Sequence, residues 1–151
     1  YDKRHLFSLM DEQKHFYSGN SRLIIDVKGW KICPLICYDL RFPVFSRNQE
    51  DYDVLVYVAN WPTSRISQWQ KLLAARAIEN QSYVVAVNRI GQDVNQVQFN
   101  GFSCVLDFKG DYLANLKNER ACCSIELDKF KLQSYRAKFP FLADKDAFTI
   151  I

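Results

Sequence analysis

The stretch "YDVLVYVA", residues 52–59, carries the strongest strand signal in the chain. It consists mainly of β-branched and aromatic residues, and the turn-forming residues "NWP" follow it at 60–62. An apolar run of this length, bounded by turn residues, is typical of a strand buried inside a sheet. The pattern therefore predicts a strand over Tyr52–Ala59.

The segment that follows predicts a helix and then a second strand. Apolar residues recur at helical spacing at Ile66, Trp69, Leu73 and Ala77, which predicts an amphipathic helix over residues 65–81. The run "SYVVAVNR" predicts a buried strand over Ser82–Arg89.

The segment before residue 52 supplies two further strands. Residues 1–21 look irregular, whereas Leu23–Val27 and Trp30–Tyr38 read as strands that flank a turn at Lys28-Gly29. Pro34 weakens the second strand, because proline cannot donate to the ladder of a central strand. A short helix over Pro43–Glu50 would begin on a proline, which is common in a first helical turn.

The C-terminal third favours hairpins. Phe102–Asp107 and Tyr112–Leu116 flank the turn residues Lys109-Gly110-Asp111, Ala121–Leu127 reads as a last strand, and residues 128–136 could form a short helix before an irregular tail. Strands alternating with helices, followed by antiparallel hairpins, predict a layered α/β fold. The chain shows no repeat or linker, and 151 residues fit one domain.

Composition argues against several classes of partner. The 20 basic and 17 acidic residues are scattered and form no basic patch, so we expect no nucleic-acid partner. The apolar runs are far shorter than a membrane span, and the chain opens on the charged "YDKRH" rather than on a signal peptide. We therefore expect no membrane partner and a cytoplasmic protein.

The five cysteines are Cys33, Cys37, Cys104, Cys122 and Cys123. They form no CxxC pair, and with only two histidines in the chain we expect neither a metal nor a cofactor. Cys37 ends an apolar run in "PLICYDLRFP", where it could be a core residue, a redox thiol or a nucleophile. A nucleophile needs a nearby base or cation, so the residues alone favour a buried core cysteine.

Four motifs change that interpretation: "YDKRHLF" (1–7), "ICYDLRFP" (36–43), "YVANWP" (57–62) and "ARAIENQSYVVAVNRIG" (75–91). In this order and spacing they resemble the nitrilase superfamily, the carbon–nitrogen hydrolases, and in particular the branch that acts on ω-amides such as 2-oxoglutaramate. The resemblance implies an α-β-β-α sandwich, with residues 1–151 forming the second half and C-terminal part of a single hydrolase domain. It also implies hydrolysis of a small amide through a cysteine thioester, with release of ammonia.

The resemblance assigns roles to individual residues. Cys37 matches the nucleophile, and Lys3 and the backbone N–H of Tyr38 would stabilise the oxyanion. Glu12 matches a second glutamate that would position the lysine, water or substrate, although Asp11 is a one-residue alternative. Without the motif, Lys3 would be interpreted as a solvated surface lysine, whereas for Glu12 a surface carboxylate and a functional residue are equally good interpretations.

The remaining motif residues have expected supporting roles. Asn60 and Trp61, with Pro62, match a loop that lines the acyl pocket, although Trp61 also reads as a partly buried aromatic residue beside a turn. We expect Asp39 and Arg41 to form a charged pair that braces the turn, and Phe42 and Pro43 to pack. Arg76, Glu79 and Asn80 are expected to form buried polar contacts that brace the fold.

The general base of the family, a glutamate preceding the lysine motif, has no counterpart in residues 1–151. We therefore expect the N-terminal part of the domain to be absent from this chain, and residues 1–151 alone to be inactive. Family members usually form dimers or larger homo-oligomers. Two alternatives remain open: another reaction of the superfamily, such as nitrile or N-carbamoyl hydrolysis or acyl transfer, or an inactive fragment that serves as an interaction module.

Overall fold

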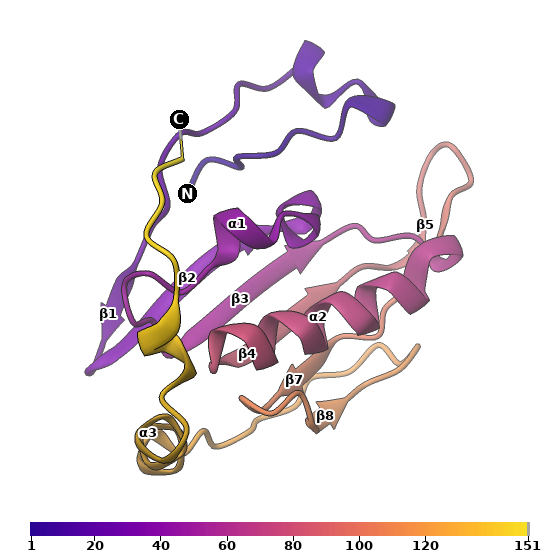
Figure 1. Cartoon of the computed structure of the whole chain (residues 1–151). Helices are drawn as coiled ribbons and strands as arrows, with labels where there is room; N and C mark the ends of the chain where they lie inside the picture. The colour runs from indigo at the N-terminus through magenta and orange to yellow at the C-terminus, as the bar shows by residue number, and fades with distance from the viewer. Residues whose placement is uncertain (151) are drawn as a thin grey trace.

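The computed structural model describes residues 1–150, and its centre is a six-stranded mixed sheet (Figure 1). The strands lie in the order β1-β2-β3-β4-β7-β8, with β2–β3 and β3–β4 parallel and the other neighbours antiparallel. Their bounds are β1 Ile25–Val27, β2 Trp30–Ile36, β3 Val54–Ala59, β4 Tyr83–Asn88, β7 Cys104–Leu106 and β8 Tyr112–Asn115. A separate hairpin joins β5 Ile90–Gln92 to β6 Gln98–Asn100. The predicted α/β class is confirmed.

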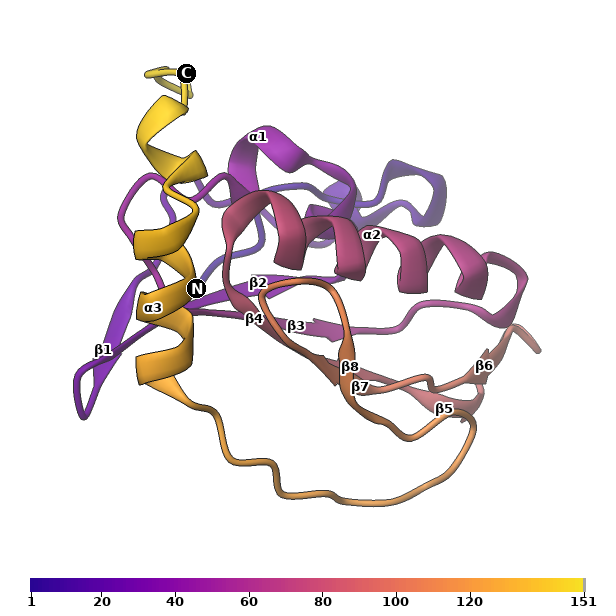
Figure 2. The same ribbon diagram turned by 60° about the horizontal axis from the view of Figure 1, so that its bottom comes forward.

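Helices α1 Pro43–Ser46 and α2 Ile66–Asn80 both lie on one side of the sheet, and α3 Lys129–Lys138 stands at one end of it (Figure 2). Helix α2 connects the parallel strands β3 and β4, as a crossover between parallel neighbours requires. Short 3-10 helices occur at Ser8–Met10, Glu12–Lys14, Cys37–Arg41, Thr63–Arg65 and Phe141–Asp144.

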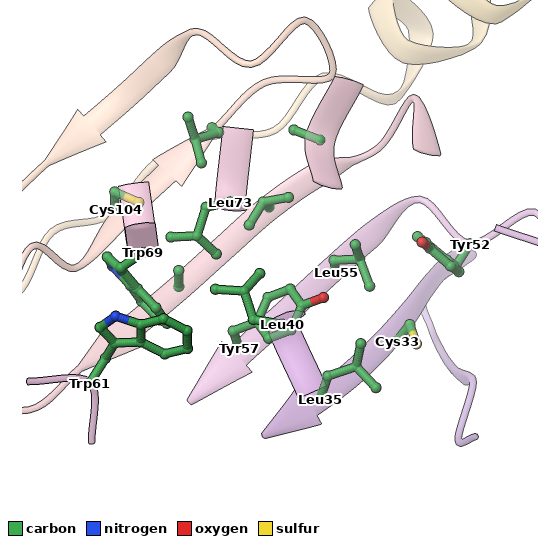
Figure 3. Packing of buried hydrophobic residues seen from close by; sticks show 14 of the residues in the cluster. Cys33, Leu35, Leu40, Tyr52, Leu55, Tyr57, Trp61, Trp69, Leu73 and Cys104 are labelled. Carbon is green, nitrogen blue, oxygen red and sulfur yellow. The ribbon is translucent and has the colours of Figure 1, made fainter. Parts of the chain in front are cut away.

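One face of the sheet forms the main core (Figure 3). Alternate strand residues point to the same face, and on the face that α1 and α2 cover (Figure 2) they are fully or almost fully buried. The contributing residues are Cys33 and Leu35 from β2, Leu55 and Tyr57 from β3, Val84 and Ala86 from β4, and Trp69, Leu73 and Ala77 from α2.

The opposite face is covered at one end only. Near the start of the parallel strands, Val54 and Tyr83 are buried against Leu132 of α3. Toward the carboxyl ends of β3 and β4 the cover is lost, and Val58 and Val87 are 48% and 53% exposed. The chain segment between β8 and α3 passes below this side without a helix (Figure 2).

The predicted central elements are confirmed with shifts of one to two residues at their ends. Strand β2 includes Pro34, which is tolerated because the ladder with β1 ends at Ile32 and leaves that side of β2 without a partner. The predicted strand ran too far, since Tyr38 lies in the 3-10 helix rather than in β2.

Two other expectations were wrong, and one element was missed. The helix predicted over Pro43–Glu50 ends at Ser46, because the buried Asn48 side chain instead donates to the carbonyls of Tyr52 and Asn80. Ala121–Leu127 forms no strand ladder, and its residues are exposed up to Leu127. The β5–β6 hairpin was not predicted, since its sequence "IGQDVNQVQFN" is mostly polar.

We expect residues 1–151, expressed alone, to fold poorly or to associate, because the apolar strip exposed at Val58 and Val87 favours aggregation. Val58→Thr should reduce this association, whereas Val44→Thr should not, although Val44 on α1 is similarly exposed, at 56%. Size-exclusion chromatography and thermal unfolding measure both effects. A soluble, cooperatively unfolding monomer would contradict the expectation.

Candidate active site

Cys37 lies where β2 ends and a 3-10 helix begins. Its φ angle is +46°, in the left-handed region that non-glycine residues rarely adopt. Such backbone strain persists only where the surroundings impose it, and it is frequent at functional sites. Cys37 is half-buried and lines a cleft of about 970 Å³.

The strained turn is held by the fully buried carboxylate of Asp39. Its Oδ2 accepts hydrogen bonds from the Ile36 backbone N–H at 3.0 Å and from the Tyr1 hydroxyl at 2.9 Å. Its Oδ1 accepts the His5 backbone N–H at 2.9 Å and lies 2.8 Å from His5 Nδ1. One carboxylate therefore ties residues 1–5 to the turn that carries Cys37.

The two side-chain partners of Asp39 are themselves fixed by packing. The His5 ring stacks on Phe42 at a centroid distance of 3.7 Å and meets the ring of Phe45 edge-on at 5.3 Å. Burial, and then the negative charge of Asp39, raise the pKa of Tyr1, so its hydroxyl stays protonated and able to donate.

Lys3 is brought to the cleft on the segment that Asp39 anchors. Its Nζ lies 2.5 Å from Glu12 Oε2, and the same oxygen accepts the Phe7 backbone N–H at 2.8 Å. Both side chains are largely shielded, with 12% and 29% exposure. Asp11, the alternative to Glu12, pairs instead with Lys14 on the surface, so Glu12 is the carboxylate that holds Lys3.

Opposing effects act on the Cys37 thiol. Burial raises its pKa, and the charges of Glu12 and Asp39 add to the rise. The positive charge of Lys3 and a hydrogen bond from the Asn60 backbone N–H act in the opposite direction. Because the net pKa is raised, the thiol is protonated at neutral pH in this structure and needs a proton acceptor to react.

The other expected residues lie in different environments. The Tyr38 ring packs against Phe7 at 4.8 Å, and its backbone N–H lies in the first turn of the 3-10 helix, where N–H groups have no intrahelical acceptor. Asn60 lines the cleft. Trp61 does not line it: its ring is buried against Trp69, and its Nε1 donates to the Arg65 carbonyl.

The charged pair expected between Asp39 and Arg41 does not form. Arg41 instead donates to Gln68 Oε1 at 2.5 Å and lies over the Trp61 ring. Arg41 can reach outward because Asp39 is already occupied by its other donors.

The buried polar bracing predicted on α2 is confirmed. Arg76 donates to the Leu40 carbonyl at 2.7 Å and to Glu79 at 3.0 Å, and Asn80 accepts the Asn48 backbone N–H. Pro43 is exposed, so of the two residues expected to pack only Phe42 does so.

Four residues near the site were missed from the sequence. Tyr1 and His5 bind Asp39, and Arg65 and Arg89 line the cleft. The motif "YDKRHLF" contained the first two, but no periodicity marked them as partners of a residue more than thirty positions away. Within residues 1–150 there is no cluster of three metal-ligating side chains, and no helix is long and apolar enough to cross a membrane.

Comparison with known proteins gives the family. The model of the carbon-nitrogen hydrolase family matches residues 1–137. The chain belongs to the carbon-nitrogen hydrolase family. The match includes the segments that carry Lys3, Glu12, Cys37 and Asn60.

Relatives in this family align over nearly the whole chain. It is 50% identical to omega-amidase YafV of Escherichia coli over 99% of its length, and 37% identical to a 2-oxoglutaramate amidase of Bacillus subtilis over 95%. The crystal structure of XC1258 from Xanthomonas campestris, a CN-hydrolase superfamily protein with an arsenic adduct in its active site, superposes with a TM-score of 0.97 at 42% identity. The superposition covers all of the present chain and 60% of the XC1258 chain. The chain spans 59% and 56% of the two curated relatives.

We expect Asp39→Asn to lower the free energy of unfolding by about 2–4 kcal/mol, because a neutral amide leaves donors of the buried cluster unpaired. Denaturant unfolding measures the change. Asp11→Asn, at an exposed carboxylate, is the matched control. Equal effects of the two substitutions would contradict the anchoring role.

Lys3→Met should raise the pKa of Cys37 further, because it removes the charge that favours the thiolate. The rate of alkylation by iodoacetamide should therefore rise at a higher pH than in the parent protein. Lys14→Met, at a surface lysine, should leave the profile in place. An unshifted profile for Lys3→Met would show that the ammonium does not act on the sulfur.

Proposed function

We propose that the longer protein containing these residues hydrolyses a small amide, with Cys37 as the nucleophile. The observation that carries the proposal is the placement of Cys37 at a strained turn in the same cleft as Lys3, whose charge acts on its sulfur. Family membership and the names of the relatives support it.

The first step is the removal of the thiol proton. Glu12 already holds Lys3 and the Phe7 N–H, so it is poorly placed to act as the base. As the family resemblance implies, we assign this role to a glutamate outside residues 1–151. The resulting thiolate attacks the amide carbon, and the carbonyl oxygen becomes an oxyanion.

Lys3 and the Tyr38 backbone N–H stabilise that oxyanion in the proposal. Both are held in place before reaction, Lys3 by Glu12 and Tyr38 by the turn that Asp39 braces. Donors positioned in advance lower the barrier because no reorganisation is needed when charge develops. The amide nitrogen takes the proton from the base and leaves as ammonia, and water then hydrolyses the Cys37 thioester.

The substrate class in this proposal is an ω-amide of a dicarboxylic acid, such as 2-oxoglutaramate. The names of two relatives support it, since one is called an omega-amidase and the other a 2-oxoglutaramate amidase. The Asn60–Pro62 loop, through Asn60 and Pro62, supplies part of the wall against which the acyl chain would lie.

We also propose that the longer protein forms a homo-oligomer. Exposed aromatic side chains on and after α3 support this, with Phe130, Phe141 and Phe148 at 77%, 58% and 40% exposure. Light scattering on the longer protein tests the proposal.

Cys37→Ala in the longer protein should reduce ammonia release from 2-oxoglutaramate by more than about 1000-fold, because no other group can form the thioester. Cys122→Ala, at an exposed cysteine, should leave turnover intact. Near-normal turnover by Cys37→Ala would refute the assignment. Assays with nitriles and N-carbamoyl amino acids separate amide hydrolysis from the other reactions of the superfamily.

A further inference from the structure

The cleft contains two arginines that the proposed chemistry does not use. Arg65 and Arg89 both line it, and within residues 1–150 neither forms an ion pair with a carboxylate. Lys3, by contrast, forms an ion pair with Glu12. The lining also contains the carboxylates of Asp2 and Asp93, but in the described part of the chain neither forms an ion pair with Arg65 or Arg89. Both guanidinium charges therefore remain available to an anionic ligand.

The two arginines differ in how they are held. Arg89 is exposed, lies over Phe99 and donates to the Gln92 carbonyl, so its guanidinium is engaged by the β5–β6 hairpin. Arg65 is half-buried, and its guanidinium lies over the Phe7 ring at 5.6 Å from the centroid. Arg65 thus has the more shielded charge, and its N–H donors are the less engaged.

The backbone of Arg65 is fixed. It ends the 3-10 helix Thr63–Arg65, its N–H donates to the Pro62 carbonyl at 3.0 Å, and its own carbonyl accepts the indole N–H of buried Trp61 at 2.8 Å. Trp61, which was predicted to line the cleft, therefore instead holds the backbone of Arg65, which does line it. A fixed backbone lowers the entropic cost of placing a long side chain.

Phe7 places this guanidinium relative to the reacting centre. The Phe7 ring contacts both the Arg65 guanidinium and, at 4.8 Å between centroids, the Tyr38 ring, and Tyr38 directly follows Cys37. The Phe7 backbone N–H holds Glu12, which holds Lys3. Arg65 thus lines the same cleft as Lys3, is linked to it through Phe7, and takes no part in the Lys3–Glu12 ion pair.

We propose that Arg65 binds the free carboxylate of the ω-amide substrate and so makes the cleft selective for amides with a distal negative charge. The inference rests on the proposed function and deepens it. In an ω-amide a short carbon chain separates the carboxylate from the reacting amide, so a second cation apart from Lys3 is required. A guanidinium suits this role because it offers paired N–H donors to a carboxylate, and partial burial strengthens the contact.

The test compares two substrates in the longer protein: 2-oxoglutaramate and pentanamide, a neutral amide of the same chain length. Arg65→Met should lower kcat/KM for 2-oxoglutaramate about 100-fold, mainly through KM, and leave pentanamide nearly unchanged. Arg65→Lys should recover part of the loss, because it restores the charge without the paired donors. Equal loss on both substrates, or an unchanged ratio, would overturn the proposal.

Two further arginine substitutions serve as comparisons. Arg41 also lies over an aromatic ring, but outside the cleft, so Arg41→Met should leave the ratio of the two substrates unchanged. Arg89→Met should change the ratio less than Arg65→Met does. If Arg89→Met alone abolished the discrimination, the carboxylate site would lie at the β5–β6 hairpin and the assignment to Arg65 would be wrong.

A binding measurement separates failure of this inference from failure of the proposed function. Glutarate should slow the alkylation of Cys37 by iodoacetamide in the parent protein, and about 100-fold more glutarate should be needed in Arg65→Met. This readout requires no turnover. If the protein hydrolysed no amide but glutarate still protected Cys37 in an Arg65-dependent way, the proposed function alone would be refuted. If glutarate protected Cys37 equally in the parent protein and in Arg65→Met, the role of Arg65 would be refuted.

Discussion

The geometry of the site depends on a single buried carboxylate, that of Asp39. A charged group with no exposed surface is costly unless donors surround it, and here the surrounding donors come from two separate segments, Tyr1 and His5 on one side and Ile36 on the other. The same contacts that satisfy the charge hold the Lys3 segment against the Cys37 turn. Since the donors compensate the charge only while both segments are in place, stability and site geometry are coupled through Asp39.

The electrostatics of the cleft follow from this arrangement. The buried carboxylate and Glu12 both disfavour a thiolate at Cys37, and burial disfavours it more, while Lys3 partly compensates. The resting thiol is therefore neutral, and the cation becomes most useful once negative charge has moved to the substrate oxygen. An ammonium group that stabilises the oxyanion more than it stabilises the enzyme with bound substrate lowers the activation barrier, and does not merely tighten substrate binding.

Periodicity was sufficient to predict the central strands and α2, because their burial against one another imposes a regular apolar pattern over Tyr52–Arg89. Periodicity gave a wrong result for Ala121–Leu127, which was predicted as a strand but pairs with no other strand in the structure. A strand depends on its neighbours, and the local sequence does not show whether a neighbour is present. Likewise, resemblance gave Cys37, Lys3 and Glu12 as candidates, but the Asp39 contacts with Tyr1 and His5 depend on the tertiary fold, and so does the burial of Trp61. Local patterns carry no information on such distant pairings.

The open face of the sheet and the cleft are parts of one surface. Val58 lies on the uncovered face, where it is 48% exposed, and it also lines the cleft beside Cys37. Both features arise at the carboxyl ends of the parallel strands, where side chains and following loops of α/β sheets converge. A segment packed on Val58 would therefore also border the cleft and shield part of it from water. Such shielding would strengthen the interaction of Lys3 with the oxyanion of the proposed reaction, because charges interact more strongly where water is excluded.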